Sequence, residues 1–252
     1  MSHRARVLIV AVTLAAVLSP LQAIPPAINI PAGLRGGDWL PVHEKMVTDR
    51  IKWWLGAIRM DNLNEDIVKH RKQLISDYRL YQDEPAYQQQ FAEIVTDMAK
   101  PYVTGEVYDR NDELTEVKRI NVAMAVAEMN SAAIQPLLAT MLASDNAAIR
   151  FFAWNGYAGI RTPLLTGQVD KQLLDAVSSA LEKESSPVVL AEVYDAVNLN
   201  PGLLVGVTDT TRKAAAATFI PLLAKTWPER LKALADAKDD KAIEAVTAGV
   251  RA

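Results

Sequence analysis

The chain has 252 residues, half of them hydrophobic, which is enough for one large core or one extended array and argues against a disordered protein. Its 27 Lys and Arg nearly balance 30 Asp and Glu without a block of like charge, which excludes the basic face of a nucleic-acid-binding protein. Only 11 Gly and 13 Pro interrupt long stretches that lack an alternating apolar pattern. The composition therefore predicts an all-α fold.

The first residues have the layout of a secretory signal peptide. A basic start, MSHRAR, precedes the apolar run Val7 to Leu18, and SPLQA ends in the small residue Ala23. A membrane anchor is the competing interpretation, but spanning a bilayer takes roughly 20 apolar residues, and Pro20 ends this run earlier. We therefore expect cleavage after Ala23 and no stable membrane span in the mature chain.

Cysteine is absent from the whole sequence. A lipoprotein anchor needs a cysteine directly after the signal, and disulfide bridges need pairs, so both are excluded. An exported chain that must hold together by packing alone suits a bacterial envelope. The predicted location is the periplasm or the exterior.

Helical patterns begin after a segment rich in proline and glycine, residues 24–38, which is a linker or an extended arm. Apolar residues at helical spacing from Trp39 to Ile58, and a second helix after the DNLNED stretch, predict an N-terminal helical hairpin over 39–82. A third helix starts at Pro85 and is closed by Pro101 and Gly105.

The chain then repeats itself. Three segments that start at Lys118, Ile149 and Val189, 31 and 40 residues apart, align with one another, and each follows another amphipathic segment. Each unit is therefore expected to be a pair of helices that must stack on its neighbours to cover its apolar face. Tetratricopeptide repeats would need a steadier period near 34 and a recurring Trp, Gly and Tyr pattern.

These units resemble HEAT repeats. The segment DNAAIRFFAWNGYAGI carries the motif best, with Ile149, Arg150, Ala153, Tyr157 and Ile160 in the expected places. The other copies depart from it, because Leu190 replaces the arginine and Lys118 replaces an apolar residue. The resemblance implies a right-handed solenoid of stacked helical hairpins, HEAT- or armadillo-like, over 83–252. In such an array the outward side of each second helix lines the concave surface.

A helical wheel of this segment separates two apolar sides. The side expected to pack inward comprises Ile149, Phe152, Ala153, Gly156, Tyr157 and Ile160. The other side carries Phe151, Trp154 and Ala158, and the aligned copy places Tyr194 at the position of Trp154. Two interpretations stand: these aromatic residues pack under other parts of the chain, or Phe151, Trp154 and Tyr194 form an exposed patch that binds a partner.

No catalytic or metal-binding motif is evident, and we predict no cofactor. His43 and His70 are 27 residues apart, and HEKMV lacks the second histidine of a zinc protease motif. DRNDELTE, from Asp109, departs from the calcium loop at Leu114 and Ile120 and is interpreted as a polar loop. Glu184 and Ser185 have the Glu-Ser order found in lytic transglycosylases, but without the surrounding pattern of that family.

Two functions remain open from the sequence. The first is an exported, non-catalytic helical-repeat scaffold or binding module of the cell envelope with a protein or peptide ligand. The alternative is an envelope hydrolase acting on a wall polymer or peptide, with a carboxylate such as Glu184 as general acid.

Overall fold

The computed structural model describes residues 27–109, 111–162, 171–204 and 206–236. The predicted signal peptide, its cleavage site after Ala23, the first linker residues and the end of the predicted repeat region from residue 237 lie outside these ranges. The described residues form nine α-helices and three short 3-10 helices, without a strand among them. The all-α prediction is confirmed for this part of the chain.

The α-helices follow one another along the chain with short connections. Their bounds are α1 (Pro41–Met60), α2 (Asn64–Tyr78), α3 (Pro85–Thr104), α4 (Thr115–Ala127), α5 (Gln135–Leu142), α6 (Ala147–Gly159), α8 (Lys171–Lys183), α9 (Pro187–Ala196) and α10 (Asp209–Asp236). The 3-10 helices are η1 (Ala32–Leu34), η2 (Ala132–Ile134) and η3 (Pro201–Leu203).

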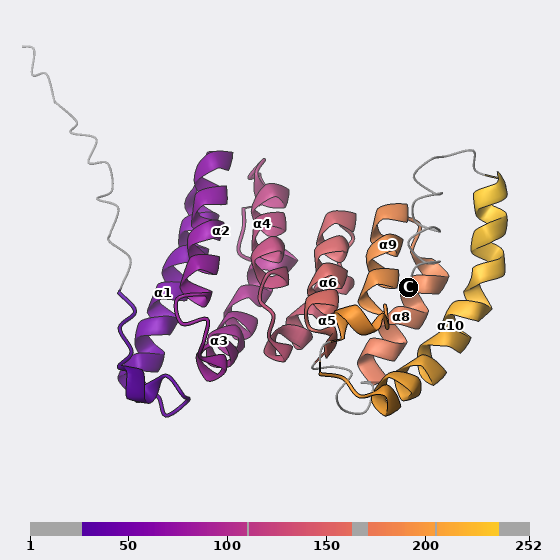
Figure 1. The fold of residues 1–252 in the computed structure, drawn as a ribbon. Helices are drawn as coiled ribbons and strands as arrows, with labels where there is room; N and C mark the ends of the chain where they lie inside the picture. The colour runs from indigo at the N-terminus through magenta and orange to yellow at the C-terminus, as the bar shows by residue number, and fades with distance from the viewer. Residues whose placement is uncertain (1–26, 110, 163–170, 205, 237–252) are drawn as a thin grey trace, which may run out of the picture.

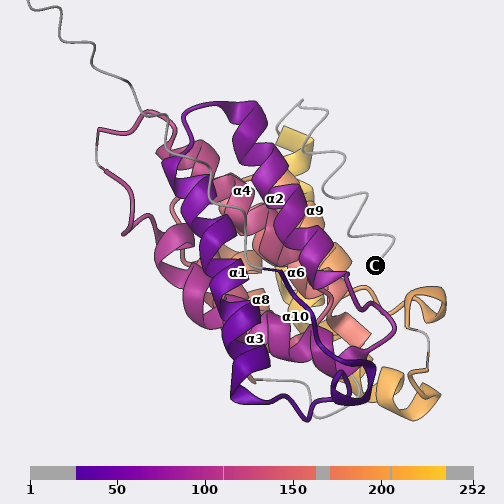
Figure 2. The same cartoon turned by 90° about the vertical axis from the view of Figure 1, so that its left-hand side faces the viewer.

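The helices pack as pairs that stand side by side in one row (Figure 1). In a first layer, α1 contacts α3, α3 contacts α5, α5 contacts α8, and α8 contacts α10. In a second layer, α2 contacts α4, α4 contacts α6, and α6 contacts α9. Figure 2 looks along this row from the end that α1 and α2 form. The N-terminal pair thus packs on α3 and α4 as each later pair packs on the one before it.

The segment before α1 is an arm that packs on the first pairs. Ile30 is fully buried, and its backbone N–H donates to the hydroxyl of Tyr81 at 3.4 Å. Arg35 lies over the ring of Tyr81, 4.0 Å from its centroid, and Gln90 of α3 donates to the carbonyl of Gly37. Burial of an apolar side chain and these bonds hold the arm in place, so the arm is the better of the two sequence interpretations for residues 27–38.

Proline and glycine set the limits of α3. Pro85 stands in the first turn, where its missing N–H costs nothing. The helix runs past Pro101, which lies inside it, and ends only at Gly105, whose φ of 91° is left-handed. The expectation that Pro101 helps to close the helix is therefore wrong, and Gly105 is the residue that ends it.

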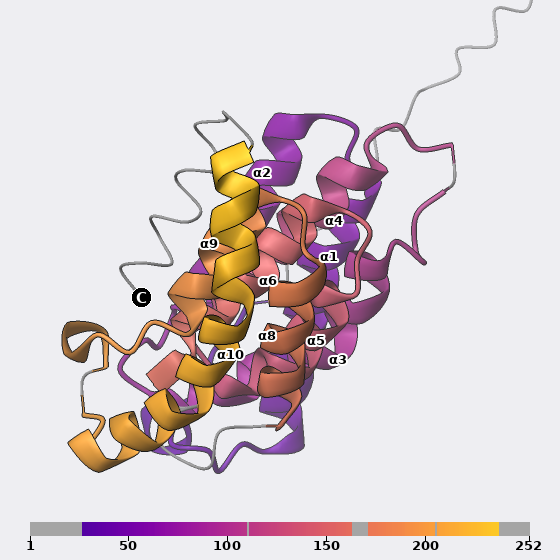
Figure 3. The same cartoon turned by 90° about the vertical axis from the view of Figure 1, so that its right-hand side faces the viewer.

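The far end of the row is formed by α10, the longest helix described. It curves across α8 and contains Pro221 and Pro228, each of which removes a backbone donor (Figure 3). Among the described residues, no helix combines the length and the apolar character that a membrane span requires.

Burial follows the alignment of the three repeated segments. Positions Ala123, Trp154 and Tyr194 are all buried, and so are Ala125, Gly156 and Ala196 two residues later. The offsets of 31 and 40 residues therefore match positions that have the same environment in α4, α6 and α9.

Candidate binding surface

Helix α6 has neighbours on three sides, namely α4, α5 and α9. The stripe that faces away from these neighbours comprises Ala148, Phe151, Phe152, Asn155 and Gly159. Phe151 and Phe152 are both half-buried, with ring centroids 5.1 Å apart in an edge-to-face arrangement. Phe152 was expected on the inward side, and its place on the outer stripe is a correction.

Two of the three aromatic residues predicted for a partner surface lie in the core. Trp154 is 1% exposed and Tyr194 is 2% exposed, so the exposed set of Phe151, Trp154 and Tyr194 does not exist in this structure. The Trp154 ring instead lies 5.5 Å from that of Tyr157. The physical reason is the packing of α4, α5 and α9 against α6, which covers the flank that carries Trp154.

The outer stripes of adjacent second-layer helices form one surface, which we call the second-helix face. Across it, Asn155 of α6 donates to Glu192 of α9 at 3.3 Å, and Arg79 after α2 pairs with Glu128 after α4 at 3.1 Å. Its apolar part lies on three helices, in their N-terminal halves except for Met124. These residues are Val117, Ile120 and Met124 of α4, Ala148, Phe151 and Phe152 of α6, and Val188 and Ala191 of α9.

The side chains of this apolar part are neither core nor fully exposed. Ile120, Phe151 and Phe152 pack against the core while part of each remains accessible, and Val188 is 53% exposed. A contiguous apolar patch with polar groups at its rim is the usual form of a protein interaction site.

The C-terminal halves of the same helices give the face a polar rim. Burial raises the pKa of Glu192 above its ordinary value although Asn155 donates a hydrogen bond to it. Asp195 is held by Arg161, whose Nη2 lies 2.8 Å from its Oδ2. Polar side chains of this rim are thus fixed by bonds between the second-layer helices.

Trp154 has a different position, at a cavity in the first layer. The cavity has a volume of about 420 Å³ and lies between the seam of α5 and α8 and the side of α6. Its walls are mostly small side chains, including Ala139, Ala176 and Ser179, which leave the seam between α5 and α8 incompletely filled. The indole of Trp154 lines this cavity while the ring as a whole stays buried.

Glu184 borders the same cavity, but its chemistry does not suit a general acid. Arg150 holds it with two hydrogen bonds, from Nε at 2.8 Å and from Nη2 at 3.0 Å, and the backbone N–H of Ser186 donates a third. Burial acts to raise the pKa of Glu184, yet these bonds outweigh it and hold the pKa below its ordinary value. A general acid at neutral pH needs a raised pKa.

Comparison of the chain with protein-family models, curated proteins and solved structures gave no match. The second-helix face and the cavity beside Trp154 are therefore interpreted from the chain's own residues.

The other residues considered for chemistry have structural partners. The ring nitrogen Nδ1 of His43 accepts from the backbone N–H of Leu40 at the start of α1. His70 is buried between α1 and α2, with Nε2 2.7 Å from Asp61 and its ring near Trp54. In the described ranges, no group of three or more His, Cys, Asp or Glu is placed to hold a metal ion.

Lys118 is a buried charged residue whose role the repeat pattern did not predict. It stands where an apolar side chain was expected and is 1% exposed. Its ammonium group donates to Asp112 at 2.7 Å and to the carbonyl of Arg59 at 2.9 Å, and the bond lowers the pKa of Asp112. It therefore joins the polar loop before α4 to the end of α1. The sequence did contain a signal for this role, namely Asp112, an acidic residue six positions before Lys118.

Proposed function

We propose that this protein is an exported, non-catalytic helical-repeat module of the cell envelope that binds a protein or peptide ligand. In this proposal the paired helices form a right-handed solenoid of the HEAT or armadillo kind, which extends from the N-terminal pair to α10. The signal-like segment Met1–Ala23 supports export, and the repeated burial pattern of α4, α6 and α9 supports the solenoid.

The observation that carries the proposal is the apolar part of the second-helix face. Three neighbouring helices place partly or largely accessible apolar side chains at equivalent positions, so the patch continues across the boundaries between pairs. Large side chains such as Phe151 and Phe152 offer contact area at small entropic cost, because their rings are already held against the core. A surface that runs across several pairs suits an extended segment of a partner.

The hydrolase alternative would need a general acid other than Glu184. Glu184 is bound by Arg150 and has a lowered pKa, so it is suited to joining helices and ill-suited to donating a proton. The binding function is therefore the better supported of the two.

A binding experiment with two charge-inserting variants tests the proposal. Residues 24–252 would be immobilised and exposed to envelope extract, and retained proteins would be identified and then purified for titration. Phe151→Glu combined with Phe152→Glu should weaken binding by about 2 kcal/mol or more. Leu40→Glu combined with Val42→Glu changes two exposed apolar residues at the start of α1, outside the face, and should leave binding unchanged.

Circular dichroism must show that both variants keep the helical fold. Equal binding by the two double variants and the parent chain would refute the second-helix face as the binding surface. Turnover of an envelope polymer by residues 24–252, lost on Glu184→Gln, would refute the non-catalytic part of the proposal.

A further inference from the structure

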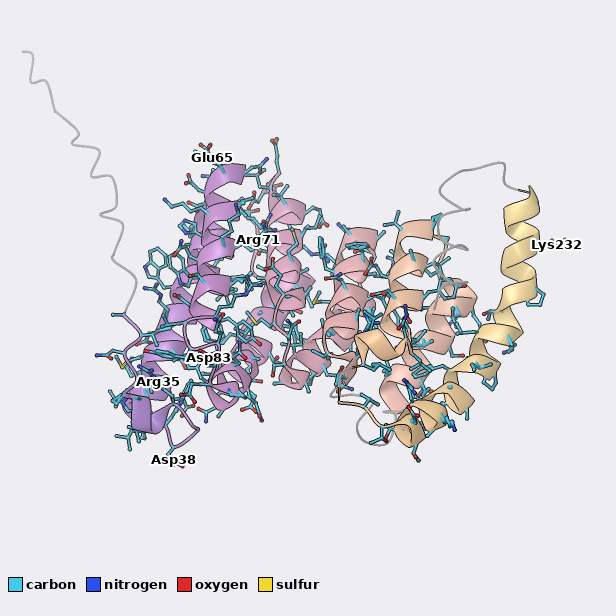
Figure 4. All side chains as sticks on the ribbon, in the orientation of Figure 1. Arg35, Asp38, Glu65, Arg71, Asp83 and Lys232 are labelled. Atoms are coloured by element: carbon cyan, nitrogen blue, oxygen red, sulfur yellow. The ribbon has the colours of Figure 1, made fainter. Side chains whose placement is uncertain are left out.

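Arg71 differs from the other half-buried arginines of the second layer. It lies in the seam between α2 and α4, where Nη1 contacts the sulfur of Met124 at 2.6 Å and Nε is buried without a hydrogen-bond partner (Figure 4). A thioether is only a weak acceptor and carries no charge. Arg119 and Arg150, on the next two second-layer helices, each pair with carboxylates. In the described part of the chain, no carboxylate forms an ion pair with Arg71.

A cavity lies between α2 and the end of α4, and its lining begins at Lys72, the residue after Arg71. Its volume is about 450 Å³, and it is lined by Lys72, Ile75, Ser76, Arg79, Leu80 and Glu128. Glu128, the sole acid of this lining, is paired with Arg79 at 3.1 Å. Lys72 lines the cavity and Arg71 precedes it on α2, outside the lining, and neither forms an ion pair in the described part of the chain. An anion at this seam would meet Lys72 in the cavity, beside the apolar Ile75, with Arg71 next to it on the helix.

Arg71 also reaches the apolar part of the second-helix face, because it touches Met124, which belongs to that part. Ile120 and the phenylalanines of α6 continue the apolar surface from there. A ligand lying across the face from α2 toward α6 would thus meet positive charge first and apolar side chains next. Arginine is suited to this position, because its guanidinium binds carboxylates with directed hydrogen bonds and tolerates partial burial.

We propose that the seam between α2 and α4 is a carboxylate subsite of the second-helix face. Its occupant is a segment of a partner protein in which an Asp or Glu precedes apolar residues, with the carboxylate on Arg71 and Lys72 and the apolar residues on α4 and α6. This inference rests on the proposed binding function and adds to it the chemistry of the ligand.

Random peptides of about twelve residues, displayed on phage and selected on immobilised residues 24–252, provide the probe. Selected sequences should be enriched in an acidic residue next to apolar ones. The synthetic peptides and their versions with Asp→Asn or Glu→Gln would then be titrated against the parent protein and Arg71→Gln. Loss of a hydrogen bond between charged groups should weaken binding about tenfold or more. The amide peptide should bind both proteins equally, because the two changes remove the same interaction.

Two further variants serve as controls for this test. Arg212→Gln removes one positive charge from α10, which belongs to the first layer, and should leave the affinity unchanged. Lys72→Gln changes an exposed side chain of the same cavity and serves if Arg71→Gln does not fold. Lys72→Gln should also weaken binding of the acidic peptide more than binding of its amide version.

The outcomes separate the inference from the proposed function. Selected peptides whose binding depends on the phenylalanines of α6, but that show no acidic preference or no coupling to Arg71 or Lys72, would overturn the carboxylate subsite. They would leave the binding function standing. Failure of the parent chain to select any peptide, together with failure to retain an envelope protein, would overturn both.

Discussion

Trp154 is the largest fully buried side chain of the described residues, and its environment makes it part of the core. It packs against Tyr157 and closes one side of the cavity between α5 and α8. Trp154→Ala should therefore destabilise the fold by about 3–5 kcal/mol, as a buried tryptophan does. Phe151→Ala, at a half-buried position of the same helix, should cost less. Denaturant unfolding of both variants measures the difference, and a loss under about 1 kcal/mol for Trp154→Ala would contradict its core position.

Gly156 lies where two helices approach α6 closely. A Cβ atom at this position would stand 2.6 Å from Cδ2 of Leu138 and 3.4 Å from the Cα of Ala127. The leucine side chain can shift, but the backbone of α4 cannot shift without moving the helix. Gly156→Leu should therefore destabilise the protein by about 1–3 kcal/mol through overpacking.

Gly56 of α1 provides the control for this substitution. It is also inside a helix, but a Cβ built there meets no atom within 4 Å. Gly56→Leu should leave the melting temperature unchanged or raise it, because leucine has the better helix propensity. A melting temperature of Gly156→Leu equal to that of the parent would show that α6 does not sit tightly against α4 and α5.

At the scale of elements, two arginines connect successive helix pairs. Arg119 of α4 donates to the carbonyl of Val103 at the end of α3 and to Ser144 before α6. Arg150 of α6 donates to the carbonyl of Ser144 and to Glu184 after α8. Each therefore joins its own pair to the next pair. Leu190 occupies the corresponding position in α9 and cannot form such bonds.

The bond between Arg150 and Glu184 should make stability depend on pH. Because the folded-state pKa of Glu184 is lowered, its contribution is complete above the ordinary carboxyl pKa of 4.5 and is lost as pH falls through the lower folded value. Glu184→Gln should reduce the free energy of unfolding at pH 7 by about 1.5–3 kcal/mol. The loss should be smaller at pH 3 than at pH 7, because pH 3 lies below the ordinary carboxyl pKa of 4.5 and Glu184 is protonated in the unfolded chain there.

Urea unfolding at several pH values measures this difference. Lys225 and Glu182 form a pair at 3.0 Å whose side chains are both exposed, and Glu182→Gln serves as the matched control with little effect at either pH. An equal cost of Glu184→Gln at pH 7 and pH 3 would show that its charge does not stabilise the fold.

At the scale of the whole molecule, export should leave a mature chain that begins at Ile24. The apolar run Val7 to Leu18 is too short to span a bilayer, and Ala23 is a small residue at the expected cleavage site. N-terminal sequencing of protein from a periplasmic fraction should read IPPAI. Recovery of an intact Met1 in the membrane fraction would refute cleavage, and a variant with Ala23→Leu, which removes the small residue, should accumulate uncleaved.

The positions of the helices could be predicted from the sequence, because helix formation depends on the local spacing of apolar residues and on local proline and glycine. The apolar periodicity from Trp39 and the start at Pro85 predict α1 and α3 to within a few residues. The three aligned segments all fall on helices, and the aligned positions Ala123, Trp154 and Tyr194 are all buried. These features need no knowledge of which helix lies beside which.

The orientation of α6 was decided only by tertiary structure. Apolar residues surround this helix, so a wheel cannot identify the one stripe that its neighbours leave open. Contacts with α4, α5 and α9 bury Trp154, which decides between the two interpretations left open for it. They leave part of Phe152 accessible, although the wheel placed Phe152 on the inward side. The same holds for Arg71, whose lack of a carboxylate depends on what α4 presents across the seam. Periodicity along one helix determines which residues share a side, whereas the packing of other helices determines which side faces water.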